Sequence, residues 1–109
     1  MYIYNITLNI DKSIHNEWLG WIESHITDVL ATGYFSSAKL TEVLVTDDDG
    51  ATTYSIQYRA KTRKNLDKYY QFNADKLRVE GLKKFGDKML AFRTELRIVS
   101  RFYPKTVSN

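Results

Sequence analysis

The chain contains no cysteine, a single proline and no apolar run that approaches the ~18 residues of a membrane-spanning helix. Without cysteine it has no disulfide framework, no thiolate zinc site and no cysteine nucleophile. Residues 1–5 lack the basic region and the long apolar stretch of a signal peptide. These absences lead us to expect a cytoplasmic protein with no membrane segment. The 109 residues suit one domain and leave no room for two sizeable cores.

The net charge is small, +3 in total, but the charges are unevenly distributed. Residues 1–50 carry two basic and eight acidic side chains, which sum to −6, and residues 51–109 carry fourteen basic and five acidic side chains, which sum to +9. The halves can neutralise each other, or the basic half can form a face for an anionic partner such as nucleic acid. That face would use Arg63, Lys64, Lys68, Lys76, Lys83, Lys84 and Lys88.

Alternating apolar and polar residues predict four strands, and apolar residues at helical spacing predict two helices. The predicted strands cover residues 2–10, 35–46, 52–60 and 88–102, and the helices cover residues 14–31 and the segment between Thr62 and Gly86. Ser13 and Thr62 are the expected N-caps, and Asp47 to Gly50 form the expected hairpin loop. A single domain spans residues 1–103 and a frayed tail spans residues 104–109.

The element order β-α-β-β-α-β predicts an α+β, ferredoxin-like fold, in which both helices lie on one face of a four-stranded antiparallel sheet. The apolar side of each strand should meet the helices. In the last strand we therefore expect Leu90, Phe92 and Leu96 beneath the helices. Gly81, inside the second helix, costs about 1 kcal/mol relative to alanine, and a close approach of helix to sheet would explain it.

The face away from the helices is expected to be polar. It is either wetted by solvent or covered by a second copy of the chain in a face-to-face dimer. The predicted last strand is about fifteen residues long, which exceeds a typical strand and favours a homodimer. The candidate residues of this polar or dimer face are Asn5, Ser55, Gln57, Arg93, Glu95 and Arg97. The predicted open face has no aromatic side chain on the first and third strands, so an RNA-recognition surface is not favoured.

Several aromatic side chains share the apolar side of the predicted elements. They either pack as ordinary core residues or line a small-molecule pocket between the first helix and the sheet. The candidate pocket residues are Trp18, Trp21, Tyr54, Tyr58 and Phe92.

Sequence motifs for catalysis or metal binding are absent. His15 and His25 are ten residues apart on one helix and point about 80° apart, so they form no metal pair by spacing. There is no H-E-x-x-H, no G-x-S-x-G, no P-loop and no G-x-G-x-x-G. We therefore assign no catalytic residue, no cofactor and no metal, and the motifs leave open whether the chain is an enzyme.

Four stretches carry a family resemblance: MYIYN (1–5), VLATG (29–33), YSIQY (54–58) and EGLKKFGDKMLAFRTEL (80–96). Together they resemble the bacterial domain of unknown function 4286. The layout is also similar to the dimeric α+β barrel superfamily, whose members pair sheet to sheet and often hold a ligand between sheet and helices. Asn5 is placed as early as the first-strand Asn of the haem-degrading branch, but both His and both Trp residues here lie on the first helix. No catalytic residue is carried over.

Three hypotheses for function follow. The first is a homodimeric ligand-binding or interaction module without its own catalytic constellation. The alternative is a monooxygenase-like small-molecule enzyme with a pocket between helices and sheet. The third, nucleic-acid binding through the basic second helix, is the least favoured by the residues.

Overall fold

The computed structural model describes residues 1–45 and 48–106. Its strands are β1 (Tyr2–Ile10), β2 (Ser37–Val43), β3 (Thr52–Ala60) and β4 (Met89–Arg97). Its helices are α1 (His15–Ala31), α2 (Arg63–Tyr69) and α3 (Asp75–Phe85), with a π turn η2 (Tyr70–Ala74) joining the last two. Short 3-10 turns, η1 (Lys12–Ile14) and η3 (Gly86–Lys88), precede α1 and β4.

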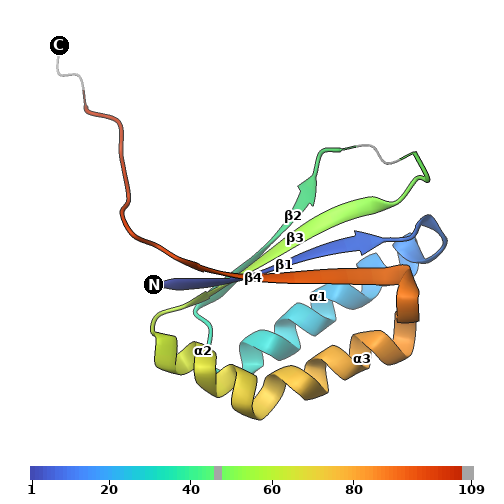
Figure 1. The fold of residues 1–109 in the computed structure, drawn as a ribbon, viewed down its shortest axis with the longest axis horizontal. Helices are drawn as coiled ribbons and strands as arrows, with labels where there is room; N and C mark the ends of the chain where they lie inside the picture. Colours follow the sequence, from blue (N-terminus) through green and yellow to red (C-terminus); the bar gives the residue numbers. More distant parts are fainter. Residues whose placement is uncertain (46–47, 107–109) are drawn as a thin grey trace.

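The four strands form one antiparallel sheet in the order β2-β3-β1-β4. Both helical segments cover the same face of that sheet, and the other face is open (Figure 1). This is the ferredoxin-like arrangement that the element order predicts, so the prediction of the α+β fold class is confirmed.

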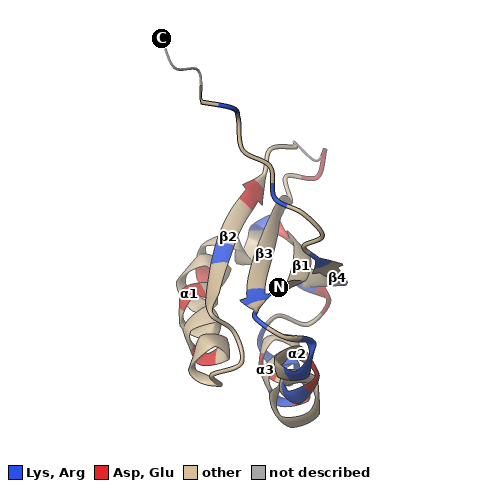
Figure 2. Ribbon diagram, turned by 90° about the vertical axis from the view of Figure 1, so that its left-hand side faces the viewer, with Lys and Arg blue, Asp and Glu red and all other residues tan. Residues whose placement is uncertain are grey.

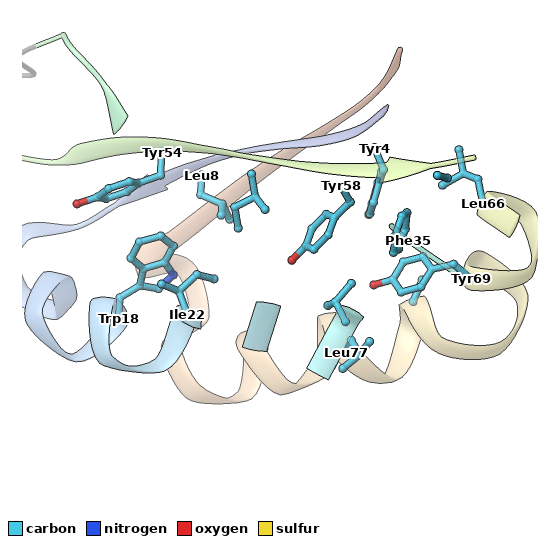
Figure 3. Close-up of a cluster of buried hydrophobic side chains, with 14 of the residues drawn as sticks. Tyr4, Leu8, Trp18, Ile22, Phe35, Tyr54, Tyr58, Leu66, Tyr69 and Leu77 are labelled. Carbon is cyan, nitrogen blue, oxygen red and sulfur yellow. The ribbon is translucent and has the colours of Figure 1, made fainter. Parts of the chain in front are cut away.

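The central strands bury the side that alternation predicts. In their register Tyr4 pairs with Tyr58, Ile6 with Ile56 and Leu8 with Tyr54, all on the side of the helices. The core lies between this side and the helices (Figure 3). Its largest fully buried side chains are Trp18, Tyr4, Tyr58, Ile10, Ile22, Ile56, Leu66 and Val29.

The side chains of the edge strand β4 lie on the faces of the sheet opposite to those predicted. Arg93 pairs with Ile6 and Glu95 with Tyr4, so Arg93, Glu95 and Arg97 share the helix side. The prediction that these three lie on the open face is wrong. Phe92, predicted beneath the helices, lies on the open face with Leu90 and Leu96, and it is 66% exposed.

The reason is that an edge strand is only partly covered, so long charged side chains can lie against the helices while their ends reach solvent. Glu95 Oε2 accepts hydrogen bonds from Arg63 Nη1 of α2 and, at 3.0 Å, from the Tyr70 hydroxyl of η2. On the same side Met89 Sδ accepts from Trp18 Nε1 at 3.3 Å. These contacts bind β4 to the helix layer through polar atoms.

The strand ends also differ from prediction. β2 and β4 are seven and nine residues long, shorter than the predicted 35–46 and 88–102. The length of the last strand therefore no longer argues for a dimer. Beyond Ile98, whose amide donates to the Met1 carbonyl at 3.0 Å, residues 99–106 form no regular structure. The predicted loop residue Asp47 and the tail residues 107–109 lie outside the described residues.

Capping residues explain where the helices begin and end. The Thr62 side chain accepts from the Asn65 amide at 3.1 Å, as predicted for α2. Ahead of α1, Asp11 rather than Ser13 is the cap, because its carboxylate accepts from the Ser13 amide at 2.9 Å. Gly33 and Gly86 follow the helix ends with φ of +86° and +59°, a conformation that side chains other than that of glycine rarely adopt.

Gly81 lies where α3 approaches both the sheet and α1. A Cβ atom added there would lie 2.7 Å from Met89 Cε and 3.2 Å from Trp21 Cη2. This confirms that a close approach accounts for a glycine inside the helix. Gly20, inside α1, has nothing within 4 Å of the corresponding position.

The two helical glycines predict opposite responses to the same substitution. Gly20→Ala should raise the free energy of unfolding by about 0.5–1 kcal/mol, because it restores helix propensity without a clash. Gly81→Ala should show no such gain, because Met89 and Trp21 must move. Urea denaturation of the two variants measures this, and an equal gain in both would contradict the close packing at Gly81.

Candidate functional site

A small cavity lies between the helices and the sheet. It leaves about 40 Å³ open to the centres of water molecules. One water molecule needs at least roughly 10–15 Å³, so the space can hold water or a very small ligand. Most of the lining is apolar, and its polar or aromatic members are Tyr4, Trp21, His25, Tyr58, Tyr69, Arg78 and Arg93.

Three lining residues have a buried polar atom without a hydrogen-bond partner: the Tyr58 hydroxyl, His25 Nδ1 and Arg78 Nε. They come from β3, α1 and α3, so three separate elements bring them to one space. Tyr58 is completely buried. Figure 3 shows its hydroxyl pointing toward the helix layer, on the same side as that of Tyr69. Unpaired buried polar atoms are rare in folded proteins, and three at one cavity mark the place where a partner is missing.

The Arg78 side chain is fixed by the sheet. Its Nη2 donates to the Tyr4 hydroxyl at 2.9 Å, which leaves Nε as the unpaired donor. Burial raises the pKa of Tyr58, with smaller contributions from Tyr69 and Tyr4. Burial also raises the pKa of Tyr69, to about 12. Both phenols are therefore neutral at physiological pH and can donate a hydrogen bond.

Two arginines stand where the cavity meets the surface. Arg78 and Arg93 line the inner cavity and also two outer hollows at the gap between α3 and β4. The outer hollows add the acidic side chains of Asp87 in one case and of Asp75 and Glu95 in the other. Arg78 and Arg93 thus lie at the side of the cavity that adjoins these hollows, which we call the cavity entrance.

His25 forms the polar part of the α1 wall. Its ring stacks on Trp21, one helical turn earlier, with centroids 4.5 Å apart and planes at 24°. Burial lowers the pKa of His25, although the nearby carboxylates of Glu80 and Asp28 act in the opposite direction. The neutral imidazole can donate or accept at Nδ1, according to its tautomer.

The structure brings two of the five predicted pocket residues to the cavity, Trp21 and Tyr58. Trp18 and Tyr54 instead pack on each other in the core, with centroids 4.8 Å apart, and the Tyr54 hydroxyl lies 2.6 Å from His15 Nε2. Phe92 is on the opposite face of the sheet. Its assignment to the pocket is wrong because the two sides of β4 are interchanged relative to the prediction.

Sequence reasoning did not identify His25, Arg78 and Arg93 as lining residues of the cavity. His25 follows Trp21 by four residues, and Arg78 lies between the inward-facing Leu77 and Gly81. Both spacings put a polar side chain at the edge of a buried helical stripe. Arg93 was assigned to the other face. The helix spacing, followed one residue beyond the apolar stripe, would have identified His25 and Arg78.

The open face of the sheet has a polar centre and an apolar edge. Asn5, Ser55 and Gln57 lie on it, as predicted. The Ser55 hydroxyl donates to Asn5 Oδ1 at 2.7 Å, and Asn5 Nδ2 donates to Thr7 Oγ1 at 3.4 Å. Along β4 the exposed side chains of Leu90, Phe92 and Leu96 form a stripe that we call the β4 apolar edge.

Charged side chains are distributed unevenly over the molecule (Figure 2). Basic residues gather on α2 and α3, and an ion pair of 3.3 Å joins Lys84 of α3 to Glu17 of α1. No helix among the described residues has the length and apolar composition needed to cross a membrane. Within residues 1–45 and 48–106, no three His, Asp or Glu side chains are grouped as a metal site.

The fold and the cavity define a ferredoxin-like α+β protein with a small, mostly apolar space between its sheet and its helices. Residues 1–99 match the family described as a domain of unknown function (DUF4286). The chain belongs to this family, which confirms the resemblance in its sequence. A search of curated proteins finds no match.

Solved structures share the fold. The de novo designed protein Foldit4 has a TM-score of 0.55 and 7% identity, over 89% of this chain and 97% of that one. The de novo designed protein LFR1 1, described as having a ferredoxin fold, has a TM-score of 0.51 and 19% identity, over 95% of this chain and 93% of that one. At such low identity these likenesses concern the fold alone.

Two buried tyrosines of β3 provide a test of the unpaired hydroxyl. Tyr54→Phe should lower the free energy of unfolding by about 1 kcal/mol, because it removes the hydrogen bond to His15. Tyr58→Phe should not lower it and should raise it by up to about 1–3 kcal/mol, because it removes a buried hydroxyl that has no protein partner. Urea denaturation compares them, and an equal loss in both variants would show that the Tyr58 hydroxyl is paired.

The lowered pKa of His25 makes stability depend on pH. In the unfolded chain His25 has its ordinary pKa of 6.5, so as the pH falls through that value the unfolded state takes up a proton before the folded state does. The free energy of unfolding should therefore fall between pH 7.5 and 5.5. His25→Gln should lose less stability than the wild type over this range. Matching slopes in urea denaturation at the two pH values would count against a buried neutral His25.

Proposed function

We propose that the chain functions as a homodimeric binding module that pairs through the open face of its sheet. The observation that carries this proposal is the β4 apolar edge. Leu90 and Phe92 lie at neighbouring positions of one side of the strand, and Leu96 follows beyond Thr94, on a face that the helices do not cover. Exposed apolar surface of this kind is typical of protein interfaces.

The charge content of the open face supports the same proposal. Among the residues that the strand pairing places on this face, only Lys39 and Arg59 are charged. Charged residues make up 27% of the whole chain. Depletion of charge at the centre of a surface is a property of interface cores. The uncharged amides and hydroxyls of Asn5, Ser55 and Gln57 can pair with the same groups of a second copy.

The ends of the sheet provide further apolar surface on that side. The β2–β3 hairpin and the C-terminal segment both extend away from the helices (Figure 1). Leu44 and Val45 of the hairpin are exposed, as are Val99, Phe102 and Tyr103 of the C-terminal segment. In a sheet-to-sheet dimer these side chains would extend the contact around the partner. A second copy of this chain therefore suits the surface.

The cavity is the place for the ligand of such a module. Its unpaired donors favour binding over a solidly packed interior. The alternative function, a monooxygenase-like small-molecule enzyme, would use the same space. The cavity in this structure is small, at about 40 Å³. We therefore favour the binding module, with the cavity as its ligand site.

The pairing is tested by a charge on the β4 apolar edge. The wild type should have about twice the chain mass of 12.8 kDa at micromolar concentration. Phe92→Lys should give a monomer, because its ammonium group would be buried in the interface. Light scattering and analytical sedimentation measure both masses.

Phe72→Lys is the matched control. Phe72 is 62% exposed, close to the 66% of Phe92, but it lies on the π turn in the helix layer. This variant should remain dimeric. A wild type of single-chain mass, or dissociation of the Phe72 variant alone, would overturn the proposed pairing.

A further inference from the structure

We infer that the cavity between the helices and the sheet is a binding site for a small organic carboxylate of the size of acetate. The carboxylate would lie against Arg78, Tyr58 and His25, and its short apolar part against the aliphatic walls. This inference rests on the ligand-binding part of the proposed function and is independent of dimer formation.

The hydrogen-bonding groups favour an acceptor as the ligand. Arg78 Nε is a donor and cannot act otherwise. The Tyr58 hydroxyl and His25 Nδ1 can each donate as well. All three are buried and unpartnered, and all three residues line the same space. A carboxylate has two acceptor oxygens with about four lone-pair sites, so one group can satisfy these donors together.

The charges favour an anion over a neutral acceptor. Arg78 and Arg93 both line the cavity, and neither forms a salt bridge among the described residues. Asp75 lines only an outer hollow, not the cavity itself. Hydrogen bonds from a guanidinium to a carboxylate are roughly twice as strong as those between neutral groups. In a largely apolar cavity this difference selects the charged ligand.

Size and lining restrict the anion to a small organic one. Acetate, a carboxylate with a single methyl group, is among the smallest organic anions, and the cavity is small, at about 40 Å³. The apolar walls include Ile22, Val29, Ile56 and Leu77, which can contact a methyl group but cannot hydrate a fully polar ion. A methyl-bearing carboxylate therefore suits the cavity better than an inorganic oxyanion does.

The experiment is a titration of the full-length protein with sodium acetate at constant ionic strength. Side-chain NMR signals of Tyr58 and His25 report occupancy. Saturable shifts with a dissociation constant in the millimolar range are expected, since so small a ligand has few contacts. Acetamide, the neutral molecule of the same shape, should bind at least about tenfold more weakly. Nitrate, a planar anion without a methyl group, should also bind more weakly.

Variants at the two tyrosines of β3 show whether a loss of acetate binding is specific to the cavity. Tyr58→Phe should weaken acetate binding about tenfold, the loss of one hydrogen bond to a charged group. The His25 signals report occupancy in this variant. Tyr54→Phe should leave acetate binding unchanged, because the Tyr54 side chain does not line the cavity. Arg78→Lys keeps the charge but removes the Nε donor, and it should also weaken binding.

The outcomes distinguish this inference from the dimer. Absence of saturable shifts, equal affinity for acetamide, or an unchanged affinity of the Tyr58 variant would each overturn the carboxylate site. None of these results depends on the oligomeric state, which the Phe92 variant measures separately. Acetate binding by a monomeric Phe92→Lys variant would support the carboxylate site.

Discussion

The interior of this protein depends on how it accommodates the hydroxyl groups of its buried tyrosines. Tyr4, Tyr54 and Tyr58 lie on the helix side of the two central strands, so their phenol groups point into an otherwise apolar layer. A buried hydroxyl without a partner costs about 1–3 kcal/mol. Tyr4 accepts from Arg78 of α3, and Tyr54 pairs with His15 of α1. Each helix is thus joined to the sheet by a polar contact within the core.

Tyr58 is the exception, because neither helix provides a partner for its hydroxyl. Tyr58 lines the cavity, and so does Arg78, which pairs with Tyr4 through Nη2 and has an unpaired Nε. A ligand that accepts from Arg78 and Tyr58 would complete the hydrogen bonding of the tyrosine layer.

Sequence reasoning was most accurate for the central strands and the helix ends. The alternation of β1 and β3, the Thr62 cap and the positive-φ glycines Gly33 and Gly86 each depend on local chemistry, which the sequence contains. It failed for β4, where both sides of the strand carry apolar residues. Tertiary packing decides between them there, because Glu95 contacts Arg63 and Tyr70 while Gly81 admits Met89. The cavity could be predicted only in part, since the position of Arg93 depends on that reversed strand.

The edge strand β4 contributes to both proposed surfaces. Its odd-numbered residues Met89, Ala91 and Arg93 line the cavity, and its even-numbered residues include the β4 apolar edge on the open face. A partner that covers the open face would hold β4 in place along one side. The same contact would restrict the movement of Arg93 at the cavity entrance. The two proposed surfaces thus use opposite sides of one strand.

The π turn between α2 and α3 positions the opposite side of that entrance. A π turn accommodates an extra residue within a helix and often occurs at functional sites. Here two consecutive tyrosines both contact the Tyr4 ring, with centroids at 5.9 Å for Tyr69 and 5.5 Å for Tyr70. Tyr69 then faces the cavity, and Tyr70 donates to Glu95 of β4. In a regular α-helix adjacent side chains lie about 100° apart. At the junction of α2 and the π turn, one residue thus lines the cavity while its neighbour joins the helix layer to the edge strand.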